Sequence, residues 1–343
     1  MNETAPNTLS RLSPVVILSH RTAVAYYRVL NPKDRKAAHA TRADPLSRAS
    51  ASSQLLKTFN PEFSGFGGLP LDLLVPDRRN VRMSKGINAH SCQVKLPEGS
   101  FWKLNDTLYI SSPELCFVQM AQMMSIPQIV EVGLNLCAIY YADIKSSKLP
   151  ERKPLTTPTK LARYVERVSG MKGVKKAKQA LRWVIAGSRS PMETKMFILL
   201  SYPPSRGGYG FSLPVLNHRA DPGRYAYLTE QGFFRIDICN PDLFVGVEYY
   251  GEDDHQDNVV KDRRRLDALE ALGWKMVVID KQRLYDPAAF EVAANQIASH
   301  LNCRIRKNSN WQKAHEALRK DLGLDASSEN HTHAQVAQPA KPM

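Results

Sequence analysis

Residues 233–279 read FFRIDICNPDLFVGVEYYGEDDHQDNVVKDRRRLDALEALGWKMVVI, and this stretch decides the fold expected for the chain. Two apolar runs open it, and each holds one acid, Asp237 in FFRIDIC and Glu248 in LFVGVEYY. The Asn-Pro-Asp between the runs is typical of a turn, so the pattern predicts two adjacent strands. The charged run that follows predicts a helix, and KMVVI predicts another strand.

The two strand acids raise the question of what satisfies them. A bare carboxylate in an apolar strand is costly, so Asp237 and Glu248 need a divalent cation, a salt bridge or exposure at a sheet edge. Mg²⁺ binds through a few carboxylates and keeps several waters, which this pair could supply. A metal held there can polarise a phosphodiester and activate water. The pattern therefore predicts either a metal site or a hairpin with ordinary surface acids.

Two further residues could support such a site. Glu193 follows Ser190 by three positions and fits a capping box at the start of a helix. The same carboxylate could instead reach from the first helical turn toward the metal. His255 lies in the acidic loop after the second strand, where it is either solvated or placed to relay a proton.

The charge of the chain points to a polyanionic partner. The formal net charge is +14 and the pI about 9.5, which favours nucleic acid. The helix expected at 174–187 carries cations opposite its apolar stripe, and they contact either phosphate or solvent. Asp262 and Arg265 lie three apart on the helix expected after the second strand and are expected to form a weak surface ion pair. Arg263, Arg264 and Arg265 also offer a phosphate clamp. Five cations are the predicted nucleic-acid contacts: Lys175, Lys176, Arg182, Arg263 and Arg265.

The expected fold class is α/β (α+β), with a mixed sheet flanked by helices in the C-terminal core and a smaller N-terminal α+β domain. The expected parts are an α+β domain at 1–148, a linker with basic helices at 149–187, a core at 188–305, and a helix with a disordered tail at 306–343. Within the core, strands are also expected at 208–216 and 223–229, before the two strands that carry the acids.

The cysteine spacing and the hydropathy of the chain indicate the cellular compartment in which it is expected. The five Cys have no C-x-x-C spacing, which disfavours a structural zinc site and fits a reducing compartment. No apolar run approaches the ~18 residues that a membrane helix needs, and the first residues have no signal-peptide pattern. A cytoplasmic protein with no membrane association is expected.

The C-terminal pattern resembles a known family. An acid on a helix, two acids on adjacent strands, then a helix and a strand are similar to the PD-(D/E)XK restriction-endonuclease-like nucleases. More narrowly, RIDICNPDLFVGVEYYGEDDHQ and the pattern D-x-x-R-x-x-x-L-x-x-x-G, from Asp262 to Gly273, resemble the very-short-patch mismatch repair endonucleases. The resemblance covers about one third of the chain.

This resemblance implies an αβββαβ-type core and Mg²⁺- or Mn²⁺-dependent hydrolysis of DNA phosphodiesters. It implies Asp237 and Glu248 as metal ligands, with Glu193 and His255 as supporting acid and proton relay. The family usually carries Lys two positions after the second acid, and here that position is Tyr250. A tyrosine supplies no ammonium to orient water.

The N-terminal half resembles the antitoxin-like domains of abortive-infection systems. VVILSHRTAVAYY, LLVPDRRN with His90 downstream, and LYISSPELCFVQMA carry this likeness. It implies a role in regulation or DNA recognition and a toxin protein as a partner. Two functions therefore stay open: a metal-dependent DNA endonuclease, and a non-catalytic antitoxin-like transcriptional regulator that binds DNA with a degenerate nuclease fold.

Overall fold

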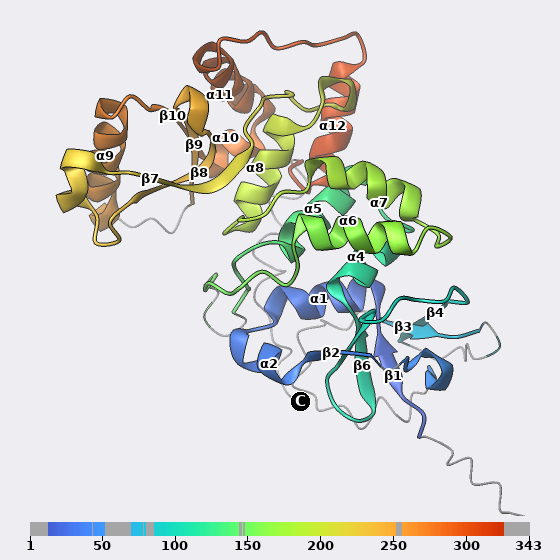
Figure 1. The fold of residues 1–343 in the computed structure, drawn as a ribbon. Helices are drawn as coiled ribbons and strands as arrows, with labels where there is room; N and C mark the ends of the chain where they lie inside the picture. Colours follow the sequence, from blue (N-terminus) through green and yellow to red (C-terminus); the bar gives the residue numbers. More distant parts are fainter. Residues whose placement is uncertain are drawn as a thin grey trace, which may run out of the picture. The chain divides into compact units, whose positions relative to one another are not determined.

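The computed structural model describes residues 13–42, 44–51, 70–77, 79, 86–143, 146, 148–251 and 256–325 (Figure 1). The chain divides into two compact units, each with its own mixed sheet flanked by helices. The first unit is Met1–Tyr26 with Lys33–Cys116, and the second is Tyr27–Pro32 with Phe117–Met343. The border predicted at residue 148 lies inside the second unit. Among the described helices, none is long and apolar enough to cross a membrane.

The first unit is built on a six-stranded sheet in the order β2-β5-β6-β1-β3-β4. Its strands are β1 (Val16–Leu18), β2 (His39–Thr41), β3 (Leu71–Val75), β4 (Ile87–Ser91), β5 (Phe101–Lys103) and β6 (Leu108–Ser111). Helix α1 (His20–Val29) follows β1. Residues 92–97 form no strand, and the segment after residue 31 holds α2 (Pro32–Ala37) and β2.

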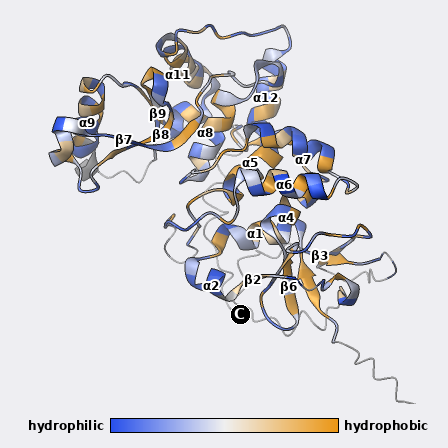
Figure 2. Cartoon of the chain, viewed as in Figure 1, coloured by the Kyte–Doolittle hydropathy of each residue, from blue (hydrophilic) through white to orange (hydrophobic). Residues whose placement is uncertain are grey.

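Helices open the second unit. They are α4 (Pro113–Met120), which begins in the first unit, α5 (Ile126–Leu136), α6 (Pro158–Arg167) and α7 (Val174–Ala180). Apolar and hydrophilic residues alternate around α6 and α7 (Figure 2). The helix expected at 174–187 instead ends with a 3₁₀ turn at residues 181–183. The next residue, Val184, packs against Gly133 of α5, where an added Cβ would lie 2.6 Å from Val184 Cγ2.

The second sheet has four strands in the order β10-β9-β8-β7. The strands are β7 (Val215–Ala220), β8 (Phe234–Asn240), β9 (Val245–Tyr250) and β10 (Lys275–Asp280). Neighbours among β7, β8 and β9 are antiparallel, and β9 and β10 are parallel. Its helices are α8 (Pro191–Ser201), α9 (Gln256–Ala271), α10 (Lys281–Tyr285) and α11 (Pro287–His300), and α12 (Trp311–Asp321) is the last described helix.

The predicted hairpin of β8 and β9 is confirmed, with a 3₁₀ turn at Pro241–Leu243 between the strands. Two other predictions are corrected. The strand expected at 208–216 begins only at Val215, after Pro214, which has no N–H for a sheet hydrogen bond. The strand expected at 223–229 is a 3₁₀ helix, in which Tyr227 is 79% exposed and no alternate face is buried.

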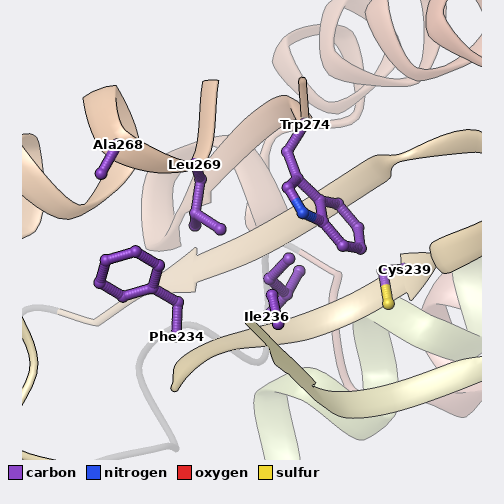
Figure 3. Packing of buried hydrophobic residues seen from close by; sticks show 7 residues of the cluster. Phe234, Ile236, Cys239, Ala268, Leu269 and Trp274 are labelled. Carbon is purple, nitrogen blue, oxygen red and sulfur yellow. The ribbon is translucent and has the colours of Figure 1, made fainter. Parts of the chain in front are cut away.

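Helix α9 packs on one face of this sheet. Phe234, Ile236 and Cys239 of β8 lie against Ala268 and Leu269 of α9, and Trp274 closes the cluster (Figure 3). Two residues of one strand share a face only at even spacing, yet Ile236 and Cys239 are three apart. The alternation therefore shifts by one residue between them, next to Asp237. On β7, the facing residue Asn217 has a left-handed φ of 52°.

Candidate active site on the second sheet

The hairpin brings the two predicted strand acids together. The last paired residues of β8 and β9 are Ile238 and Val247, and Asp237 and Glu248 are the next residues beyond that pair on the two strands. Asp237 Oδ2 accepts a hydrogen bond from the Tyr249 backbone N–H at 2.9 Å, which takes the place of a regular ladder bond. The acids therefore sit where the two strands separate.

Glu248 is held by α9. Its side chain is buried, and its two oxygens accept hydrogen bonds from Arg265 Nη1 and Nη2 at 2.8 and 2.6 Å. Arg265 also donates to the Arg235 carbonyl at 2.8 Å, while the predicted partner Asp262 lies farther off, at 3.8 Å. Burial raises the pKa of Glu248 to about 7, because it and the charge of Asp237 outweigh the help from Arg265.

The Glu193 carboxylate bonds to β7 and does not complete the predicted capping box. Ser190 caps α8 by accepting from the Glu193 backbone N–H at 3.1 Å, so this half of the predicted box is confirmed. The buried Glu193 carboxylate accepts from the Arg189 backbone N–H at 2.9 Å and from Asn217 Nδ2 at 2.6 Å. The side chain therefore turns from its own helix toward β7.

Asp237 is electrostatically coupled to both of the other acids, Glu193 and Glu248. Burial, together with the charge of Glu193, raises the pKa of Asp237 to about 7, against the hydrogen bond from Tyr249 and the positive charges of Arg265 and Arg189. Asp237 in turn raises the pKa of Glu248. We call Glu193, Asp237 and Glu248 the acid row.

Asn217 belongs to the same site and carries no signal in the sequence. The β7–β8 register places it opposite Asp237, between the pairs Leu216–Ile238 and His218–Ile236. Its Nδ2 donates to Gly187 O at 2.9 Å and to Glu193, which fixes the orientation of the amide. Its Oδ1 is buried and has no hydrogen-bond partner among the described residues. Asn is among the few residues that adopt a left-handed backbone readily, which explains its place at this kink.

The oxygen atoms gathered here suit a hard cation. Within the described ranges, no three His, Cys, Asp or Glu side chains are grouped so that they could hold a metal ion. Mg²⁺ needs only one or two carboxylates, with water and neutral oxygens completing the shell. Asp237 and Glu248 with the unpartnered Asn217 Oδ1 offer that set. At the position where Lys was expected, burial raises the pKa of Tyr250 to about 12, so it stays neutral.

The other predicted site residues lie apart from the acid row or outside the described chain. His255 lies outside the described residues. Three predicted nucleic-acid contacts are exposed on α7 and the turn after it: Lys175, Lys176 and Arg182. Arg263 is exposed on α9 and pairs with Asp267 at 3.1 Å. Arg265 differs from these, because Glu248 takes up its guanidinium.

No protein-family model matches this chain. Searches of curated proteins and of solved structures found no match either.

Proposed function

We propose that the chain is a metal-dependent DNA endonuclease in which Asp237 and Glu248 hold the metal ion. The observation that carries this proposal is the acid row, where two carboxylates on neighbouring strands have pKa values raised to about 7. Burial and mutual repulsion both oppose the ionised forms. A divalent cation relieves both, because it restores the charge balance that one arginine leaves incomplete.

Each residue of the site has a role in the proposed reaction. A bound Mg²⁺ or Mn²⁺ would polarise the phosphodiester and favour attack by water. Asp237, Glu248 and Asn217 Oδ1 would hold the ion. Glu193 is a positioning residue, because its 2.6 Å hydrogen bond aims the Asn217 amide so that Oδ1 stays free. Arg265 fixes the Glu248 carboxylate through two hydrogen bonds.

The order of the elements and the charge of the chain also support the proposal. The second sheet and its helices follow the order α8-β7-β8-β9-α9-β10, which is the αβββαβ order that the nuclease resemblance implies. A net charge of +14 favours binding to DNA. We extend the proposal to a restriction-endonuclease-like core on this basis.

A non-catalytic, antitoxin-like DNA-binding regulator is the second candidate. Arg265 favours it, since its bidentate contact with Glu248 already neutralises one acid of the row. Tyr250 favours it too, because no ammonium stands at that position. In this case the sheet would serve to present DNA-binding surfaces, and a toxin protein would be a partner.

Cleavage of supercoiled plasmid separates the two functions. We expect nicking by the wild type with Mg²⁺ or Mn²⁺, none with EDTA, and a loss of at least about 100-fold in D237N. D242N is the matched control, since Asp242 is exposed in the turn of the same hairpin. This variant should cleave like the wild type. Salt-sensitive DNA binding without cleavage under either metal would overturn the endonuclease and support the regulator.

A further inference from the structure

Two arginines face each other directly across β7 and β8. Arg219 and Arg235 are paired in the strand register, one step past the His218–Ile236 pair. Like charges in this position repel, and such pairs destabilise a sheet. A fold that keeps this pair has a site where an anion would be stabilising.

An aromatic ring holds both guanidinium groups in place. The Phe233 ring lies 4.6 Å from the Arg219 Cζ and 5.3 Å from the Arg235 Cζ, measured to the ring centroid. Cation–π contacts of this kind restrict the side chains without neutralising their charge. Arg219 remains exposed and Arg235 is partly buried, so the pair is ordered and still open to a ligand.

A third arginine, Arg189, and two acids, Glu151 and Glu193, also act on Arg235. The pKa of Arg235 is lowered by burial and by the charges of Arg189 and Arg219, so three arginines lie within electrostatic reach of one another. Arg189 is paired with Glu151, which leaves the Arg219–Arg235 pair as the cations available to an incoming anion.

The pair also lies beside the acid row. Arg235 precedes Asp237 by two residues on β8, and Arg219 follows Asn217 by two residues on β7. Two residues of a strand span about 7 Å. The charge of Glu193 reaches Arg235, and Arg265 bonds both the Arg235 carbonyl and Glu248, so the cations and the acids share one framework.

We propose that Arg219 and Arg235 bind the phosphodiester backbone of a nucleic acid next to the acid row. This rests on the proposed function for the choice of ligand. The planar guanidinium donates two parallel hydrogen bonds to phosphate oxygens, which suits a pair held on a ring. A bound phosphate relieves the repulsion between the arginines and places the adjoining phosphodiester near Asp237 and Glu248.

Binding of fluorescent duplex DNA in EDTA, measured over a range of NaCl concentrations, tests this inference. We expect R219Q/R235Q to bind about 10-fold more weakly than the wild type and to reduce the slope of log K against log salt by about 2. The control R304Q/R306Q removes the same charge from two exposed arginines between α11 and α12. Equal losses in both double variants, or no loss in R219Q/R235Q, would overturn the proposal.

The outcomes separate this inference from the proposed function. Binding in EDTA requires no cleavage, so a specific loss in R219Q/R235Q stands even if the wild type never cuts DNA. Conversely, if cleavage depends on Asp237 but R219Q/R235Q binds DNA normally, the arginine proposal fails and the endonuclease proposal stands. The exposed single variant R219A guards against misfolding, and it should show about half of the change in salt slope. Equal competition by poly-glutamate would assign the pair to acidic peptides instead.

Discussion

Arg265 donates hydrogen bonds to both carboxylate oxygens of Glu248, at 2.8 and 2.6 Å, and only 22% and 5% of the two side chains is exposed. This pair joins α9 to β9 at one member of the acid row, Glu248. Its geometry is bidentate, which is the strong form of an arginine–carboxylate contact. Removing one partner leaves the other buried and uncompensated, so the two residues are expected to depend on each other.

We therefore predict that R265A lowers the free energy of unfolding by about 3–5 kcal/mol at pH 8. The E248A/R265A variant should lose clearly less than the sum of its single variants, because no lone charge remains. Urea denaturation measures all three. The control R263A removes an exposed arginine of the same helix, whose pair with Asp267 should contribute below about 1 kcal/mol. Additive losses would contradict the coupling.

Asp237 predicts a pH dependence of stability. Its folded-state pKa, about 7, lies above the ordinary 3.8, so between these values the folded chain binds more protons than the unfolded chain. The free energy of unfolding therefore falls as the pH rises through this window. D237N removes the titration and keeps an oxygen for the Tyr249 N–H. In EDTA at pH 8 the free energy of unfolding of D237N should exceed that of the wild type by up to about 4 kcal/mol, since the pKa of Asp237 is raised from 3.8 to about 7 and each pKa unit corresponds to about 1.4 kcal/mol.

Denaturation in EDTA at pH 5 and pH 8 checks this prediction. The gap between D237N and the wild type should narrow toward pH 5, where the wild-type carboxyl is mostly protonated. D242N, in the exposed turn, should show no such gap. A wild-type stability that rises between these pH values in step with D237N would show that Asp237 ionises normally.

The apolar runs predicted the β8–β9 hairpin and the nearness of Asp237 and Glu248, because alternation and turn residues are local signals. They did not predict Asn217, whose place at the kink depends on a left-handed backbone and on the register with β8. The bond of Arg265 to Glu248 was also missed, since spacing within the helix suggested Asp262. Contacts between a helix and a strand are set by packing, which the order of residues does not reveal.

The shift in alternation on β8 explains a further limit. Strict alternation places Ile236 and Cys239 on opposite faces, yet both contact the α9 cluster. The 3₁₀ helix at Gly223–Leu228 was likewise misjudged, because its aromatic residues have strand propensity while their side chains are exposed or partly buried. Propensity carries little weight where no buried face rewards it.

Gly246 predicts a packing limit on the strand that carries Glu248. A Cβ at this position would lie 2.6 Å from Met276 Sδ and 2.8 Å from Ile236 Cγ2, both closer than real contacts allow. We expect G246A to lower the free energy of unfolding by about 1–3 kcal/mol. The loss caused by G246A should be smaller in an M276A background than in the wild type. G170A is the control, since a Cβ there meets nothing within 4 Å.

Thermal unfolding with divalent cations tests the acid row without any nucleic acid. An ion that binds only the folded state stabilises it by mass action, by about 2.7 kcal/mol when its concentration is 100 times its Kd. We expect Mn²⁺ to raise the Tm of the wild type at pH 8 and to raise it less at pH 5, where protons compete for Asp237 and Glu248. D237N should lose most of the increase, and D242N should keep it.

N217A should lose part of the increase in Tm, because Asn217 Oδ1 is a neutral ligand rather than a carboxylate. An equal rise in the wild type and D237N would place any bound Mn²⁺ elsewhere on the chain.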